Sequence, residues 1–504
     1  MKLKKSIVLL ALLALIPVSG TLPAQTFRAS RSPLEVTLSS LSGVTEVLRL
    51  ESTEFTEKYQ IKVRQMVNHN EVRDGFFEQR IFVMHVGADR PTVLVTEGYG
   101  ADYASSPRYR EELSRLLNAN LVVVEHRYFS QSTPQPRTWK HLTGEQAMTD
   151  LHKIREMLRP VYQGKWIATG ISKGGQTALM YRTLYPDDVD ITVSYVGPLC
   201  QNVEDGRHEP FIKNKVGTKE DREKVLAFQK ELLIRKDSIM PDFTSFCEKA
   251  GYKFTEPLTD IYDFAVLEYS FAFWQWGTPV ENIPAVSAPD SLLFAHFMKI
   301  SSPDYMMRDT PTMSFFVQAA KQLGYYGYDT NPFRFKVTRT RFIPDSEKAI
   351  AKREAKEAKK AAKEAKKDST AVINGVNTAE ENDEKTIGNT TEITGKWVTK
   401  KYPAMELKTA EGYLSKIFLP DFYKPRFNKK LYKMQSNFVK TTDARLVFLY
   451  GEWDPWTAAA VPNPGKPNVL YFVQPGGNHR TRIGTLPQEM RDQLLKQLEA
   501  WLNE

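Results

Sequence analysis

The stretch from Lys165 to Tyr181 most narrows what this chain can fold into. Within it, the apolar run Trp166 to Ile171 predicts a buried strand, and the residues after Gly174 have a helical pattern. Ser172 lies between them, flanked by Gly170 and Gly174 in a G-x-S-x-G arrangement. A strand-to-helix turn this tight leaves no room for side chains at the two flanking positions. We therefore expect Ser172 to be an exposed nucleophile; the competing interpretation is an ordinary glycine-rich turn.

The first 24 residues predict a secretory signal peptide. Met1 to Lys5 is basic, Ile7 to Val18 is apolar, and small residues follow up to Ala24. The apolar run is too short to cross a bilayer core of about 30 Å, and no other stretch is long and apolar enough to do so. We therefore expect a soluble, exported chain with no membrane span, located in a periplasm or outside the cell.

The chain contains two cysteines, Cys200 and Cys247. Because an exported protein folds in an oxidising compartment, one Cys200–Cys247 disulfide is the simplest prediction. Two separately buried thiols are the alternative. Their spacing does not match a metal site, and nothing else in the sequence suggests a metal or an organic cofactor.

The formal net charge of +9 raises the question of an acidic partner such as nucleic acid. Three lysines of the leader contribute +3, and residues 347–368 contribute +4 through nine Lys or Arg and five Asp or Glu. Only +2 is left for the rest of the chain. The basic balance is therefore local, and we predict no nucleic-acid partner.

Two kinds of strand pattern occur in the first part of the chain. Residues 59–66 and 76–84 alternate apolar and polar side chains, which predicts antiparallel strands at one side of a sheet. Continuous apolar runs then follow at residues 91–96, 121–124 and 190–195, with helical patterns between them. Such runs predict a parallel sheet covered on both faces, and hence an α/β fold.

The strand and helix alternation stops between residues 197 and 432, where the sequence is helix-rich and aromatic. We expect this segment to be a helical lid inserted between two parts of a core, residues 25–196 and 433–504. Within the lid, residues 347–394 form a charged insert. Its Ala/Lys/Glu tract up to Lys367 predicts a solvated helix or spacer, with contact to an anionic surface as the alternative, and its remainder is expected to be disordered.

Three residues form the candidate catalytic group. Ser172, Asp454 and His479 each follow the end of a predicted core strand, and catalytic groups of parallel sheets gather at those ends. Their order along the chain is that of the α/β-hydrolase arrangement. All seven other histidines precede the second part of the core, so only His479 fits this order. We expect His479 to act as the base, Asp454 to orient it, and Ser172 to form an acyl-enzyme.

The oxyanion formed during such a reaction needs two backbone N–H donors. One is expected from Lys173, at the start of the helix that follows Ser172. The other is expected from Gly98 or Tyr99 in the loop after the strand that ends at Thr96. The alternative for that loop is a plain glycine turn.

Six further residues are candidates for substrate binding. Glu97 and Glu125 both end strands near this site, where a carboxylate could bind a free peptide amino terminus or pair with Arg127 or another base. A flat apolar ring such as proline could lie against tryptophans; the candidates are Trp274, Trp276, Trp453 and Trp456. The alternative for these tryptophans is core packing.

Several motifs occur together and in order along the chain. They are Glu125-His-Arg-Tyr-Phe129, Gln146-Ala-Met-Thr-Asp150, Gly170-Ile-Ser-Lys-Gly-Gly175, Tyr269-Ser-Phe with Trp274-Gln-Trp276, and Gly451-Glu-Trp-Asp-Pro-Trp456. With them the chain resembles the secreted bacterial prolyl tri- and tetrapeptidyl aminopeptidases and, more distantly, lysosomal prolyl carboxypeptidase. The resemblance implies a serine exopeptidase that releases short peptides from a free amino terminus by cleaving after proline. It also implies Ser172, Asp454 and His479 as the triad beneath a helical cap.

Two other functions remain open on the sequence. A carboxylesterase or lipase could use the same three residues, and a peptide-binding protein could have kept the fold without activity. A free-amine anchor and a narrow aromatic slot would favour the peptidase, whereas a long apolar trench would favour the esterase.

Overall fold

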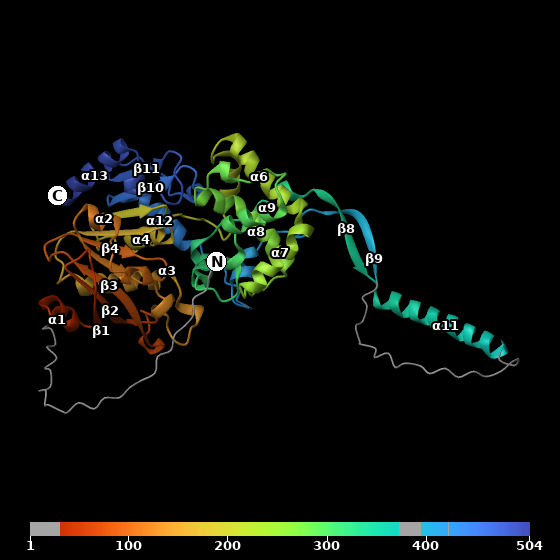
Figure 1. The fold of residues 1–504 in the computed structure, drawn as a ribbon. Helices are drawn as coiled ribbons and strands as arrows, with labels where there is room; N and C mark the ends of the chain where they lie inside the picture. The colour runs from red at the N-terminus through yellow and green to blue at the C-terminus, as the bar shows by residue number, and fades with distance from the viewer. Residues whose placement is uncertain (1–30, 372–394, 422) are drawn as a thin grey trace, which may run out of the picture.

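The computed structural model describes residues 31–371, 395–421 and 423–504. The predicted signal peptide and the part of the charged insert at residues 372–394 lie outside the described residues. Figure 1 shows a sheet-based core, a helical lid beside it, and an arm of two strands and one helix that extends away from the lid.

One nine-stranded sheet forms the core, in the order β1-β2-β3-β5-β4-β6-β7-β10-β11. The pairs β1–β2, β2–β3 and β3–β5 are antiparallel, and the remaining neighbours are parallel. This mostly parallel sheet confirms the predicted α/β-hydrolase class, with the antiparallel strands at one side. The strands are β1 (Val44–Leu50), β2 (Glu57–Met66), β3 (Phe76–His85), β4 (Thr92–Thr96), β5 (Asn120–Val124), β6 (Trp166–Ile171), β7 (Ile191–Tyr195), β10 (Arg445–Gly451) and β11 (Val469–Gln474).

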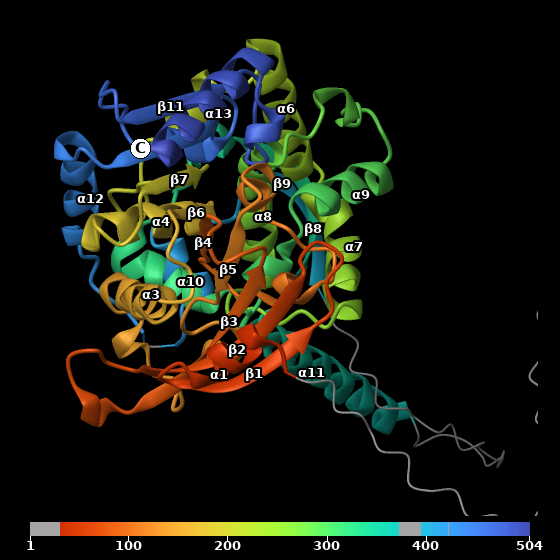
Figure 2. The same ribbon diagram turned by 90° about the vertical axis from the view of Figure 1, so that its left-hand side faces the viewer.

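Helices cover both faces of this sheet, as Figure 2 shows in a view turned by 90°. Successive residues of a strand face opposite sides of the sheet and so contact different helices. In β4, Leu94 packs with residues of α3, α4 and α12, whereas Val93 and Val95 pack with residues of α2 and α13 on the other face. Strands buried on both faces need continuous apolar runs, which is the pattern that the sequence has. The core helices are α1 (Pro33–Ser40), α2 (Glu112–Leu116), α3 (Gly144–Leu158), α4 (Lys173–Leu184), α12 (Lys430–Thr441) and α13 (Gln488–Asn503).

The lid is inserted between β7 and β10 and has its own apolar centre, rich in aromatic side chains. Residue 432, where the sequence suggested the lid would end, falls inside α12, which packs against the core helix α4. Within the described residues no helix has the length and hydropathy needed to cross a membrane. The lid helices are α5 (His208–Asn214), α6 (Lys219–Ile234), α7 (Lys236–Lys249), α8 (Leu258–Gln275), α9 (Asp290–Ile300) and α10 (Met313–Gln318).

The arm consists of the antiparallel ribbon β8 (Lys336–Pro344) and β9 (Gly395–Pro403) and of helix α11 (Glu347–Ala371). The side chains described on α11, up to residue 364, are solvent-exposed apart from the half-buried Ile350. The ribbon was not expected from the sequence, because its two strands are separated by about fifty residues and neither is predominantly apolar.

The predicted disulfide is not formed. Cys200, in the segment after β7, and Cys247, on α7, are both free and buried. Burial raises the pKa of the Cys247 thiol to about 11. The alternative of two buried thiols therefore describes this structure, since each is packed as a small apolar side chain in the lid's hydrophobic cluster.

Candidate active site

Ser172 lies at the turn between β6 and α4, where the sequence analysis placed it. Its backbone has φ 58° and ψ −121°, a conformation that residues other than glycine rarely adopt. The Ser172 N–H donates to the Tyr195 carbonyl at 2.8 Å, which holds the turn against β7. A Cβ atom on Gly170 would lie 2.3 Å from the Gly174 carbonyl carbon, so the turn excludes any larger residue there.

His479 and Asp454 form a hydrogen-bonded pair. The Nδ1 atom of His479 lies 2.7 Å from Oδ2 of Asp454, and both side chains are buried. The other Asp454 oxygen accepts the Trp456 N–H at 3.1 Å, which fixes the carboxylate plane. Ser172 and His479 line the same cavity of about 460 Å³. The three predicted residues are therefore gathered at one place, from three different strand ends.

The lid contributes to the position of the histidine. The His479 N–H donates to the carbonyl of Gln275, the last residue of α8, at 3.0 Å. The ring of Trp276 meets the His479 imidazole edge-on, with centroids 5.9 Å apart. The end of a lid helix thus holds the loop that carries His479.

The loop after β4 approaches the start of α4 closely. The Lys173 ammonium donates to the Gly98 carbonyl, and a Cβ atom on Gly98 would lie 2.7 Å from Lys173 Cγ. The Gly98 N–H donates to Glu97 Oε1 at 3.0 Å. The backbone N–H of Tyr99 also forms a hydrogen bond to that carboxylate. Both candidate donors of this loop therefore lie beside the Glu97 carboxylate.

Two ionisable groups adjoin Ser172: Lys173 is buried and Glu97 is half-buried. Burial lowers the pKa of the Lys173 ammonium to about 7, against the opposing charge of Glu97. Desolvation has the opposite effect on the carboxyl of Glu97, whose pKa it raises. The Tyr103 hydroxyl, which donates to Glu97 Oε2 at 2.5 Å, opposes this rise. The Lys173 ammonium also lies over the rings of Tyr99 and Phe129, at 5.4 and 5.1 Å from their centroids.

Ser172 lies between two cavities. The larger, of about 460 Å³, is bordered by Glu97, Tyr103, Glu111, Trp276, His479, Arg480 and Arg482 among others. The smaller, of about 130 Å³, lies under the lid and is bordered by Tyr99, Gln176, Pro198, Glu268, Gln275, Tyr305, Phe315, Tyr325, Tyr326 and Trp456 among others. Gln275, Tyr99 and Ser172 border both, so these three residues mark the junction between the two spaces.

Glu268 is the residue of this site that the sequence analysis missed. It lies on α8, is only 6 % exposed, and accepts hydrogen bonds from the hydroxyls of Tyr326 and Tyr328, each at 2.8 Å. Burial raises the pKa of the Glu268 carboxyl to about 7 despite these two donors. A signal for it existed, because Glu268 is the one charged residue in the apolar stretch from Phe264 to Trp274.

Glu125 does not reach either cavity. Its carboxylate is fully buried, pairs with Arg80, and accepts from Ser132 Oγ at 2.8 Å and the Ala101 N–H at 3.0 Å. The structural alternative considered for Glu125 therefore holds, with Arg80 in place of Arg127 as its partner.

The four candidate tryptophans separate into two pairs. Trp456 borders the small cavity and Trp276 the large one. The indole N–H of Trp456 is buried and has no hydrogen-bond partner among the described residues. Trp274 and Trp453 border neither cavity; their rings pack edge-on, 6.2 Å apart. For this second pair the core-packing alternative describes the structure.

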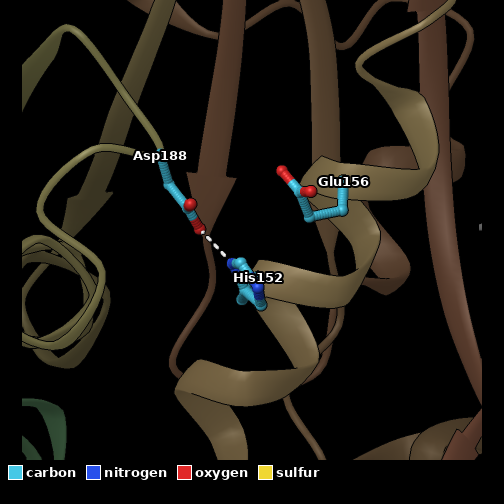
Figure 3. Close-up of side chains that lie close together, drawn as sticks. All are labelled: His152, Glu156 and Asp188. Carbon is cyan, nitrogen blue, oxygen red and sulfur yellow. Dashed lines mark hydrogen bonds and ion pairs between the residues drawn. The ribbon is translucent and has the colours of Figure 1, made fainter.

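One group in the described part of the chain has ligand atoms close enough for a metal: His152, Glu156 and Asp188. Figure 3 shows His152 hydrogen-bonded to Asp188, at 2.8 Å, with Glu156 beside them on α3. Asp188 precedes β7, whereas Ser172 follows β6, so the two sites lie at opposite edges of the parallel strands. The Asp188 carboxylate also accepts the Tyr181 hydroxyl at 2.6 Å, and this network links α3 to α4.

Comparison with known proteins confirms the resemblance found in the sequence. Residues 36–346 match the family described as PS-10 peptidase S37. The chain is 36% identical over 271 residues to the prolyl tri/tetrapeptidyl aminopeptidase of Streptomyces mobaraensis, covering 52% of this chain and 55% of that protein. It is 29% identical over 164 residues to the lysosomal Pro-X carboxypeptidase of Bos taurus, covering 29% and 33%.

These matches span about half and one third of the relatives' own lengths. Among solved structures, an open-form lipase aligns over 88% of this chain and 100% of its own, with 11% identity and a TM-score of 0.34. The family match covers more than half of the residues and includes the Ser172 turn, Glu97 and Glu268. On that evidence the chain belongs to peptidase family S37.

Proposed function

We propose that this protein is an exported serine exopeptidase that releases short peptides from a free amino terminus and cleaves preferentially after proline. Membership of family S37 supports a serine peptidase, and the similarity to a prolyl tri/tetrapeptidyl aminopeptidase supports the exopeptidase assignment. The leader-like pattern of residues 1–24 supports export to a periplasm or to the medium.

The proposed reaction begins with proton transfer. His479 takes the proton of the Ser172 hydroxyl as its oxygen attacks the scissile carbonyl carbon, and it returns that proton to the leaving amine. Because Asp454 binds Nδ1 of the imidazole, the other ring nitrogen is the one left to exchange this proton. Water then attacks the acyl-enzyme with the same assistance, and the released peptide leaves with a new carboxylate.

The oxyanion would be stabilised by the Lys173 N–H, at the first position of α4, where no intrahelical acceptor exists. The second donor would be the Gly98 or the Tyr99 N–H, both of which lie beside the Glu97 carboxylate. The ammonium of Lys173 holds the Gly98 carbonyl and thereby orients this loop.

The observation that carries the exopeptidase proposal is the small cavity shared by Ser172 and the buried Glu268. A carboxylate in an apolar, enclosed space is costly unless a cation or several donors meet it. A peptide α-ammonium would supply both charge and donors, in the geometry of a charge-assisted hydrogen bond. A carboxylate beside the nucleophile has no comparable use in an esterase.

The remaining walls of that cavity suit a proline ring. Phe315, Tyr325 and Trp456 are aromatic, and about 130 Å³, roughly four water molecules at about 30 Å³ each, is room for one such ring; the rest of a longer acyl peptide needs space beyond this cavity. The free indole N–H of Trp456 is available to a substrate carbonyl. The larger cavity, on the other side of Ser172, would then receive the part of the peptide that leaves first.

A substrate panel tests the proposal. Chromogenic peptides of two to four residues ending in proline or alanine, each with a free or an acetylated amino terminus, are compared with short acyl esters. We expect free proline peptides to have the highest kcat/KM and Ser172→Ala to lower kcat by roughly 10⁴-fold or more. Equal rates on acetylated peptides would refute the amino-terminal anchor, and turnover of esters alone would refute the peptidase.

A further inference from the structure

The arm carries a local excess of positive charge. Residues 336–364 and 395–403, which comprise β8, β9 and most of α11, include thirteen Lys or Arg and five Asp or Glu, a formal charge of +8. Residues 365–394 between them add three Lys and six Asp or Glu, so residues 336–403 together carry +5. In Figure 1 helix α11 extends away from both the core and the lid, so the charge on this helix lies apart from the rest of the molecule.

The charges on α11 are separated onto different sides. At about 100° per residue, five lysines fall within an arc of about 80°: Lys348, Lys352, Lys356, Lys359 and Lys363. The glutamates Glu347, Glu354, Glu357 and Glu364 lie on the opposite side, in an arc of about 100°. All these side chains are exposed. The helix therefore presents one continuous row of lysines rather than a mixed surface; we call it the lysine row.

An exposed aromatic pair lies where the ribbon meets this helix. Trp397 is 71 % exposed and Phe342, its partner in the strand register, is 37 % exposed, with ring centroids 5.6 Å apart. Residues paired directly across two strands share a face of the ribbon. Arg339 and Arg341, on the other face, bind the Leu233 carbonyl and Asp237 of the lid. The aromatic pair therefore faces away from the lid.

We propose that the arm docks on an anionic lipid bilayer surface, with the lysine row against the headgroups and the Phe342–Trp397 pair inserted at the interface. Tryptophan is favoured at the boundary between headgroups and acyl chains, and rows of basic residues are attracted to anionic lipids. The proposal concerns where the protein resides and is independent of the peptidase chemistry.

The arm's charge favours this partner over a second copy of the chain, because two segments 336–403 that each carry +5 repel each other. Arg341 is held by Asp237 and Glu406, at 2.9 and 2.6 Å. These contacts fix the ribbon against the lid. Docking through the arm would therefore orient the whole protein on the membrane.

The test is co-sedimentation of the mature chain with vesicles of phosphatidylglycerol and phosphatidylcholine mixed, and of phosphatidylcholine alone. We expect binding to the anionic vesicles only, weakened at least tenfold by raising the salt from 50 to 500 mM. The variant Lys352→Gln/Lys356→Gln/Lys359→Gln/Lys363→Gln should lower the binding constant by at least tenfold, and Phe342→Ser/Trp397→Ser by about tenfold.

Matched controls change the same residue types elsewhere. Lys429, Lys430, Lys433 and Lys440, at or on α12, are exposed lysines and are replaced together by Gln. Val286→Ser/Leu292→Ser removes two exposed apolar side chains of the lid. Both controls should bind as the parent does, and all variants should keep its kcat/KM on a soluble peptide. Equal binding to neutral vesicles, binding unchanged in either arm variant, or sedimentation as a dimer joined through the arm would overturn the proposal.

Discussion

The Nδ1 atom of His479 lies 2.7 Å from Oδ2 of Asp454, and each partner of this pair is held by a different part of the fold. Asp454 follows β10 of the core, whereas the backbone of His479 is bound by Gln275 at the end of the lid helix α8. The same helix carries Glu268, two turns earlier. Movement of the lid would therefore shift His479, the proposed base, together with Glu268, the proposed amino-terminal anchor.

Replacing Asp454 by Asn should lower kcat by about 10⁴-fold with little change in KM, because the imidazole would lose the partner that sets its tautomer. Steady-state kinetics on a free proline peptide measures both constants. Asp443 is the control: its carboxylate is exposed and pairs with Lys466, so Asp443→Asn should behave as the parent. A drop of less than tenfold for Asp454→Asn would remove Asp454 from the triad.

Affinity for free peptides should depend on pH through Glu268. Burial raises the pKa of Glu268 to about 7, so the carboxyl becomes neutral below that pH and loses its attraction for an ammonium. The α-amino group of a substrate deprotonates above about 8. We expect kcat/KM to peak between these two pH values. Glu268→Gln should lower kcat/KM roughly 10- to 100-fold and should remove the rise of KM at low pH. Acetylated peptides, which have no ammonium, should show neither effect.

The same group should affect stability in a predictable direction. The pKa of Glu268 is raised in the folded protein relative to the unfolded chain, so the folded state holds its proton longer and stability falls as pH rises from about 4 to about 7. The free energy of unfolding of the parent should therefore fall by about 2–3 kcal/mol between pH 5 and pH 8 relative to that of Glu268→Gln. Urea unfolding followed by tryptophan fluorescence measures the difference; equal pH dependence of the two proteins would contradict it.

Glu97 should not behave as an amino-terminal anchor, because Oε1 is already bound by the Gly98 N–H and Oε2 by the Tyr103 hydroxyl, whereas both tyrosine donors of Glu268 bind its Oε2. In Glu97→Gln the amide oxygen can still accept the Gly98 N–H. We expect the ratio of kcat/KM for free and acetylated peptides to stay within about twofold of the parent, in contrast to Glu268→Gln. A selective rise in KM for free peptides would transfer the anchor to Glu97.

The Ser172 turn should not tolerate a methyl group at position 170. The Cβ of Gly170→Ala would lie 2.3 Å from the Gly174 carbonyl carbon, which only a backbone shift can relieve. We expect a loss of about 1–3 kcal/mol or more in stability and no labelling of Ser172 by a fluorophosphonate. Gly206→Ala is the control, since its Cβ would meet no atom within 4 Å.

The sequence by itself was sufficient for the class of fold and for the turn that carries Ser172. Continuous apolar runs between helical patterns predict a two-sided parallel sheet, and the Gly170 and Gly174 pair predicts the Ser172 turn, because both depend on local geometry and strand order. The order of Ser172, Asp454 and His479 follows from the same topology. These features are encoded over short stretches, so they are readable without coordinates.

The tertiary structure alone decided which polar groups meet the cavity beside Ser172. Glu125 pairs with Arg80, whereas Glu268 borders the small cavity from a lid helix nearly a hundred residues after Ser172. Nor did the cysteine spacing reveal that Cys200 and Cys247 stay apart. Contacts of this kind depend on how the lid packs against the core, which is set by many weak long-range interactions that no local pattern contains.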